Sequence, residues 1–303
     1  FLAQLRVTQG RLLEATLLWG KALAICLDDP IIAKFRYPIY ADMENLGAVL
    51  VMQGQHAQSA IILSRAIELR RLAKDEDYTE LSAQSYLAQA QAFQNNNKMA
   101  QEIFSETTTR CGEYYRESIA SLDPALLDQN CAMILYHAAE FNRRQGNNGV
   151  AEILYRRAFA TYLPSYQAPP DEKSELPHWR ARRHDYIGRL YLAVPSTDTG
   201  GLAEQHLQSA LSLYESVYGP ASFQSSEAMR LYGLIILKRG LTKNSVGWLE
   251  AALAAKKHAL GANHPDVATA LESLALGLHQ DGRKSQALIK EAEARRIRGL
   301  LIT

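Results

Sequence analysis

The chain has 303 residues, of which 47% are hydrophobic and 21% are charged, a composition typical of a folded globular protein. Its 33 lysines and arginines nearly balance its 32 acidic residues. The basic excess that accompanies binding to nucleic acid or to an anionic membrane surface is therefore missing. No apolar run reaches the roughly 20 residues needed to span a bilayer. We expect no nucleic-acid partner and no direct insertion into a membrane.

A pattern of small residues recurs along the whole chain and predicts antiparallel helix pairs. Each copy has an apolar helical stretch with one small residue, a Gly or Asn turn, and a second helical stretch with two small residues seven apart. Small residues mark the points where two helices approach closely. In chain order, the small residue of the first helix is Ala3, Gly47, Ala88, Ala139, Gly188, Gly233 and Ala275.

This pattern predicts one continuous array of about seven repeats. The expected ranges are 1–27, 38–74, 79–119, 128–163, 178–218, 221–260 and 265–300. The first repeat is expected to be truncated at its N-terminus, because Ala3 aligns with Gly47 in the middle of a helix. The proline-rich stretch from Leu163 to Pro177 is expected to be a loop, but the repeat phase continues across it, so no domain boundary is expected there. One helix pair cannot bury its apolar surface alone, so the pairs must stack into a solenoid.

Two stretches resemble the tetratricopeptide repeat (TPR). "LGANHPDVATALESLALGLHQDGRKSQALIKEAEAR" from Leu260 resembles the kinesin-light-chain style of about 42 residues, and "ENLGAVLVMQGQHAQSAIILSRAIELRR" from Glu44 resembles the general repeat. The resemblance implies an all-α fold, a right-handed α-solenoid of stacked antiparallel helix pairs. It also implies a concave groove, lined by the first helix of each repeat, that binds an extended peptide or a partner helix.

The resemblance places the candidate binding residues on the first helices of repeats three to five, on the side away from the small-residue seam. They are Tyr86, Gln89, Phe93, Tyr136, Glu140, Arg143, Arg182, Asp185 and Arg189. Arg and Tyr are enriched in binding hot spots, and a guanidinium matches a carboxylate. We therefore expect a protein or peptide partner that is acidic and carries an aromatic or apolar anchor. The alternative is a solvated face whose arginines pair with its own Asp and Glu residues.

Enzyme chemistry is poorly supported by the sequence. It lacks the phosphate-binding, dinucleotide-binding and nucleophile-elbow motifs, and its eight histidines do not take metal-ligand spacing. We expect no catalytic residue, no cofactor and no metal, and hence a non-catalytic interaction scaffold. Two alternatives stay open: a structural subunit of a larger complex or filament, and the TPR portion of a larger regulatory protein.

The three cysteines are too few for a disulfide framework. Cys111 and Cys131 lie about equally far from the turn near Ser121, so they can come level on adjacent helices, either as thiols or as a disulfide. The start without Met favours an extracytoplasmic, processed chain, whereas the sparse cysteines favour a reducing compartment. The balance leans slightly towards a periplasmic or secreted protein.

Overall fold

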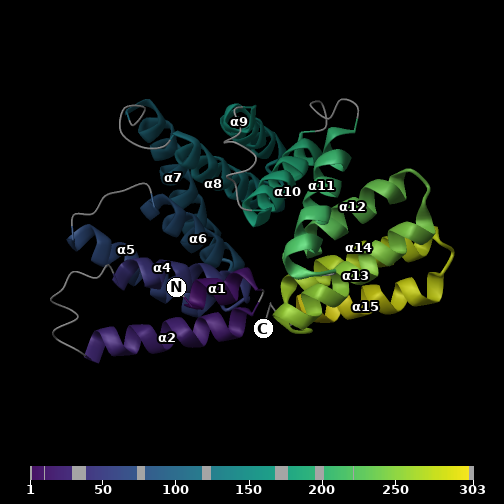
Figure 1. The fold of residues 1–303 in the computed structure, drawn as a ribbon, viewed down its shortest axis with the longest axis horizontal. Coiled ribbons are helices and arrows are strands. Elements are labelled where there is room, and N and C mark those ends of the chain that lie inside the picture. Colours follow the sequence, from purple (N-terminus) through teal and green to yellow (C-terminus); the bar gives the residue numbers. More distant parts are fainter. Residues whose placement is uncertain are drawn as a thin grey trace. The chain divides into compact units, whose positions relative to one another are not determined.

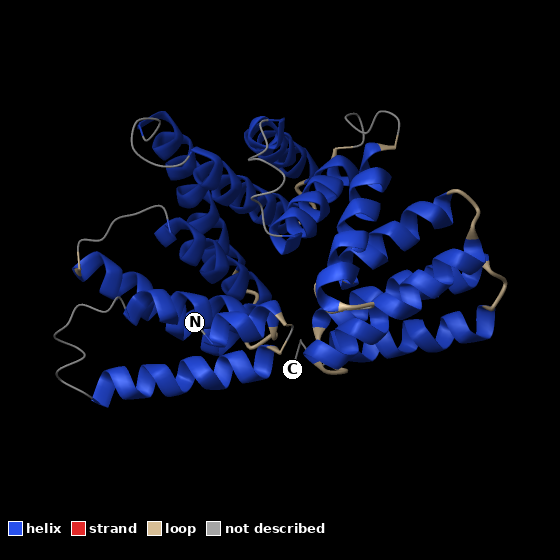
Figure 2. Cartoon of the chain, in the orientation of Figure 1, coloured by secondary structure: helices blue, strands red, loops and turns tan. Residues whose placement is uncertain are grey.

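The computed structural model describes residues 2–9, 11–28, 39–73, 79–117, 124–167, 177–194, 201–220 and 222–299. Over these ranges every regular element is a helix and no strand occurs (Figure 2). The prediction of an all-α fold is confirmed. None of the helices in the described ranges is long and apolar enough to cross a membrane.

The helices follow one another in pairs along the chain (Figure 1). The pairs are α1 (Leu2–Thr8) with α2 (Leu12–Asp28), α4 (Ile39–Met52) with α5 (His56–Leu72), α6 (Thr79–Phe93) with α7 (Asn97–Glu117), α8 (Pro124–Arg144) with α9 (Asn148–Gln167), α10 (Pro177–Ala193) with α11 (Leu202–Tyr218), α12 (Ser226–Lys238) with α13 (Thr242–Leu260), and α14 (Pro265–Gln280) with α15 (Lys284–Gly299). The prediction of consecutive helix pairs is confirmed. From α4 onward the two helices of each pair pack against each other.

The chain divides into two compact units. Unit 1 comprises Phe1–Val7 and Leu12–Pro169, and unit 2 comprises Thr8–Arg11 and Pro170–Thr303. Within each unit the second helix of one pair packs on the first helix of the next, as α5 does on α6 and α13 on α14. This is the stacking of a TPR-like solenoid. The organisation of all seven repeats as one domain stays a prediction.

The small-residue seam lies where the two helices of a pair cross. A Cβ atom placed on Gly47 would lie 2.4 Å from Cγ of Leu63, and one on Gly188 would lie 2.8 Å from Cγ of Leu207. Two seams also hold a hydrogen bond that the size of the residues alone does not predict. Ser59 Oγ donates to the Gly47 carbonyl oxygen at 2.8 Å, and Ser245 Oγ repeats the contact with Gly233 at the same distance.

The turns between paired helices use the left-handed backbone conformation, as predicted. Gly54, Gly146, Gly240 and Gly282 have φ angles of 74°, 79°, 79° and 77°. Repeat three has Asn95 at this position with φ 63°, the one non-glycine residue with a positive φ among those described. Asn tolerates this conformation better than most residues. The predicted turn at Gly10 lies outside the described residues.

Prolines start three of the described helices and interrupt none of them. Pro124, Pro177 and Pro265 are the first residues of α8, α10 and α14, where a missing N–H costs nothing. The loop expected to begin at Leu163 does not begin there, because α9 continues through Pro164 to Gln167. A proline in the final turn removes only one intrahelical hydrogen bond, so the helix can continue for that turn.

Two buried cations are neutralised within their own helix pair. Arg70, only 3% exposed on α5, donates from Nε and Nη2 to the Glu44 carboxylate on α4 at 2.8 and 2.9 Å. Lys256, only 6% exposed on α13, lies 2.5 Å from Glu227 on α12. A buried charge without a partner would cost several kcal/mol, so these contacts hold each pair in register.

Candidate partner-binding site

The predicted binding residues divide between the two units. Six lie in unit 1 on the neighbouring first helices α6 and α8: Tyr86, Gln89, Phe93, Tyr136, Glu140 and Arg143. The other three, Arg182, Asp185 and Arg189, lie on α10 in unit 2. Helices α6 and α8 pack against each other, so the structure brings the first six together.

His137 organises the middle of the surface in unit 1. We call Tyr86, Gln89, Tyr136 and His137 the α6–α8 face. Nδ1 of His137 lies 3.1 Å from Nε2 of Gln89 and 3.2 Å from Oγ of Ser85. The centroids of the Tyr86 and Tyr136 rings lie 6.0 and 6.2 Å from that of the imidazole. All four side chains of this face are partly exposed, so a ligand can reach them.

Phe93, the third predicted aromatic anchor, is already in a stack. The His56 ring lies parallel to it, with centroids 4.3 Å apart and an interplanar angle of 7°. The Arg144 guanidinium lies 4.9 Å from the Phe93 centroid in a cation–π contact. Phe93 therefore links α5, α6 and α8.

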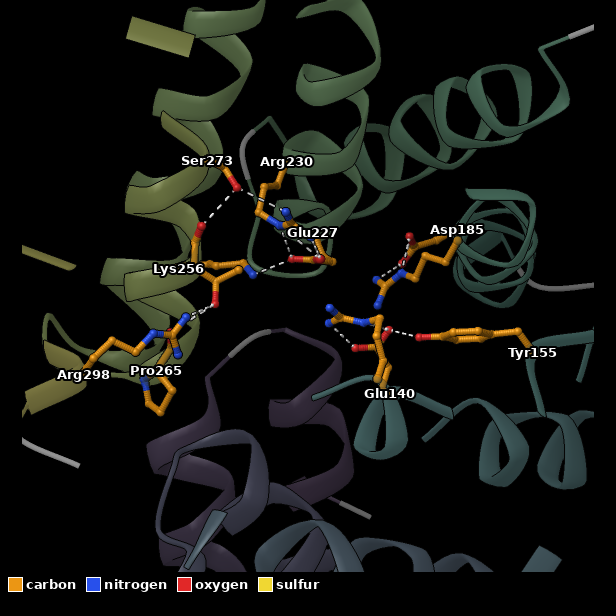
Figure 3. A network of polar contacts seen from close by, with 12 residues as sticks. Glu140, Tyr155, Asp185, Glu227, Arg230, Lys256, Pro265, Ser273 and Arg298 are labelled. Carbon is orange, nitrogen blue, oxygen red and sulfur yellow. Dashed lines mark hydrogen bonds and ion pairs between the residues drawn. The ribbon is translucent and has the colours of Figure 1, made fainter. Parts of the chain in front are cut away.

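Glu140 is held by two neighbours (Figure 3). Arg143 Nη2 donates to Glu140 Oε2 at 2.8 Å, and the hydroxyl of Tyr155 on α9 donates to Oε1. Burial alone would raise the pKa of Glu140, but the hydrogen bonds from Arg143 and Tyr155 outweigh it and hold that pKa below its usual range. Burial and the nearby Glu140 charge raise the pKa of Tyr155. Glu140 is thus ionised at neutral pH.

The three predicted residues of unit 2 contain a similar pair. Arg189 donates to both carboxylate oxygens of Asp185, at 2.9 and 2.5 Å, and Tyr214 from α11 lies 3.5 Å from the same carboxylate. Asp185 is 7% exposed and mainly holds Arg189, whereas Arg182 is exposed. Arg143 and Arg189 thus form internal acid–base pairs, with Glu140 and Asp185, as the alternative interpretation of the sequence expects.

A second group of charges on unit 2 was not selected from the sequence. Glu227 and Arg230 on α12, together with Lys256 on α13, form a compact cluster (Figure 3). Glu227 lies six residues before the seam glycine of its repeat and Arg230 three before, the positions held by Arg182 and Asp185 one repeat earlier. The sequence contains this signal, because comparing the same repeat positions beyond repeat five would have found both residues.

Two further pairs of titratable groups are buried or partly buried. Nδ1 of His184 lies 3.0 Å from Nδ1 of His206, within hydrogen-bond distance, and burial lowers the pKa of His184 to about 4. Cys111 and Cys131 meet as free thiols in one apolar cluster, level with each other as predicted, with Cys131 Sγ 3.8 Å from the Cys111 carbonyl oxygen. No group of three or more metal-ligating side chains occurs in the described part of the chain.

Comparison with known proteins finds similarity in structure. No protein-family model matches the sequence, and curated protein sequences give no match. The structure is similar to the Rap conjugation gene regulator of plasmid pLS20 bound to its Phr peptide (TM-score 0.68, 11% identity, 99% of this chain and 72% of that chain). It is also similar to the apo form of RapI (0.55, 13%, 98% and 95%) and to aspartyl phosphate phosphatase F from Bacillus subtilis (0.57, 14%, 98% and 68%). At such identities the likeness shows the fold, a solenoid of TPR-like helix pairs.

Proposed function

We propose that this chain is a non-catalytic scaffold that binds an extended peptide or a partner helix on the α6–α8 face. The observation that carries the proposal is the set of partly exposed tyrosine, glutamine and histidine side chains on two adjacent first helices. Tyr supplies large contact area at a low entropic cost, and amide and imidazole groups can bind a ligand's backbone. The Rap regulator that binds the Phr peptide has the same fold, which supports a peptide ligand for this one.

The ligand proposed for this face has an aromatic or apolar anchor and acidic side chains. The anchor would contact Tyr86 and Tyr136, whose rings are both neighbours of His137. A ligand carboxylate near Arg143 would share that guanidinium with Glu140. The absence of a catalytic role belongs to the proposal, supported by the engagement of Glu140 and His137 with their own neighbours.

Selection from a displayed random peptide library tests this function on the full chain. Selected peptides are expected to contain an aromatic or large apolar residue and at least one acid. Replacing Tyr86 and Tyr136 together by Ala should weaken their binding by about 2–4 kcal/mol, the range for hot-spot truncation, measured by calorimetry.

The matched control replaces Ile61 and Ile153, which are 72% and 61% exposed on the second helices α5 and α9, by Ala. This control should leave the affinity unchanged. If it weakens binding and the tyrosine pair does not, the ligand site lies on the second helices. The alternative of a structural subunit that assembles through that face would then take the place of the scaffold.

A further inference from the structure

A ladder of charges runs across three helices of unit 2, and its carboxylates are outnumbered. We call Asp185, Arg189, Glu227, Arg230 and Lys256 the charged ladder; it contains three cations and two carboxylates on α10, α12 and α13. Arg189 contacts Asp185, while Arg230 and Lys256 contact Glu227 (Figure 3). The ladder therefore has a net positive charge after its internal pairs are formed.

Glu227 occupies a site that is built for a carboxylate. Arg230 Nε lies 3.1 Å from each Glu227 oxygen, its Nη2 lies 2.5 Å from Oε1, and Lys256 Nζ lies 2.5 Å from Oε2. The guanidinium of Arg230, which forms a fork of donors, is also held by α14, because its Nη1 donates to Ser273 Oγ at 3.2 Å. Such a fork and ammonium together form an arrangement suited to binding an anion.

The surrounding charge strengthens this arrangement. Burial would raise the pKa of Glu227, but Lys256 and Arg230 outweigh it, and Arg189 adds to their effect, so the pKa of Glu227 lies well below its usual range. Arg189 thus acts electrostatically on both carboxylates of the ladder. Glu227 is 26% exposed, so solvent reaches the edge of the site, whereas Lys256 is 6% exposed and stays in place behind it.

Apolar contact is available one turn along α14. Leu276 follows Ser273 by three residues on the same helix and is 48% exposed. A bound segment with an acidic residue close to an apolar one could therefore contact Arg230 and Leu276 together.

We propose that the charged ladder is a binding site for an acidic side chain of a bound segment, and that Glu227 is its internal competitor. The ligand carboxylate would take the Arg230 fork, and Glu227 would keep Lys256. This inference rests on the proposed peptide-binding function, and it adds a second contact surface whose affinity the chain limits with its own carboxylate.

The test uses a fluorescein-labelled peptide with four glutamates around one leucine, and the peptide with glutamines in their place as a blank. Fluorescence anisotropy at low salt measures binding to the full chain. Glu227→Gln is expected to bind the acidic peptide about three- to tenfold more tightly than the parent chain, because it frees the fork without changing its shape. Arg230→Gln should weaken binding at least about tenfold.

Glu272→Gln is the matched control. It makes the same charge change on α14, where Glu272 is 50% exposed and pairs with Arg298 at 3.1 Å. Long-range charge alone would tighten binding equally in both variants, and that result would overturn the proposal. Unchanged binding in Arg230→Gln would also overturn it.

A second variant covers the case in which Glu227→Gln loses stability, since it leaves Lys256 without a carboxylate. Glu227→Gln with Lys256→Met removes both charges and should bind more tightly than Arg230→Gln. Binding no tighter than that of Arg230→Gln would overturn the proposal. If the ladder variants change nothing while the Tyr86 and Tyr136 variant still loses its selected peptides, this inference fails and the proposed function stands.

Discussion

At the crossing of α4 and α5 the backbone of one residue touches the side chain of another. Gly47 leaves no room for a Cβ atom, because Leu63 fills that space and is fully buried. Gly20, in the middle of α2, has no atom within 4 Å of the place where its Cβ would lie. Glycine is therefore required by packing at position 47, whereas no packing contact requires it at position 20.

We expect Gly47→Ala to destabilise the chain by about 1–2 kcal/mol. Overpacking typically costs about 1–3 kcal/mol, and the better helix propensity of Ala offsets part of that cost. Gly20→Ala is the matched control and should stabilise by about 0.5–1 kcal/mol, through propensity alone. Urea unfolding followed by circular dichroism measures both. Equal effects of the two changes would contradict the packing role of Gly47.

The sequence shows which positions must be small, because close helix crossings demand it in every repeat. It does not show which charges pair, because partners are set by side-chain reach across helices. Arg143 and Arg189 were predicted as ligand contacts from residue type and helix face, yet each donates to an acid on its own helix, at i−3 and i−4. The cluster of Glu227 and Arg230 was not predicted, for the same reason. Their positions in the repeat can be found in the sequence, but the side chains that surround them in the fold cannot.

At the scale of elements, the pairing of α10 with α11 contains an uncommon contact between two imidazoles, whose Nδ1 atoms lie 3.0 Å apart. Burial lowers the pKa values of both His184 and His206, and each is further lowered by a neighbouring positive charge. The Tyr191 ring stacks on His206 with centroids 5.7 Å apart. The pair therefore remains neutral in the folded chain at a pH where free histidine is partly charged.

We expect this pair to make stability fall as the pH drops from about 6.5 towards 4. The unfolded chain takes up protons near pH 6.5, while folded His184 takes one up only near pH 4, so the unfolded state binds more protons in between. The loss should be about 1–2 kcal/mol, because solvent screens a partly exposed ring. Thermal unfolding between pH 5 and 7, above the range of the carboxylates, measures it.

Replacing His184 and His206 together by Gln should remove most of this pH dependence. His279→Gln, which alters a histidine bonded to Glu291 at 2.8 Å and leaves the pair intact, should retain it. The same slope in the double variant and the parent chain would show that other groups produce it.

Helix ends were predictable where a residue is uniquely suited to a backbone conformation. The turn glycines and Asn95 take the left-handed region, and Pro124 and Pro177 begin helices. Pro164 misled the prediction, because a proline near a helix end can be tolerated by the last turn. Whether it stops a helix depends on packing, which local sequence does not contain.

At the scale of the whole molecule, the principal contacts among the described helices join near neighbours in the chain. The principal contacts of α4 are with α2, α5 and α6, and those of α14 are with α12, α13 and α15. In such a fold, stability is roughly a sum over repeats and their interfaces. The compartment and the single-domain organisation stay predictions.

A local change should therefore have a local effect. We expect Gly47→Ala to speed amide hydrogen exchange in α4, α5 and α6 and to leave α12–α15 unchanged, because no principal contact connects them directly. Hydrogen-exchange mass spectrometry resolves the two regions in one experiment. Uniform acceleration over the whole chain would indicate one cooperative unit and contradict nearest-neighbour additivity.

The neutralisation of buried charge inside single helix pairs has a consequence for how such a chain can change length. Arg70 finds Glu44, Asp185 finds Arg189 and Tyr214, and Lys256 finds Glu227, always within one pair. Deleting or duplicating one of these pairs would carry both members of these contacts together. Other ion pairs cross between helix pairs, such as Glu80 on α6 with Arg71 on α5 at 3.2 Å, so recombination at the turns between pairs would have to repair those contacts as well as the apolar faces on which the next pair stacks.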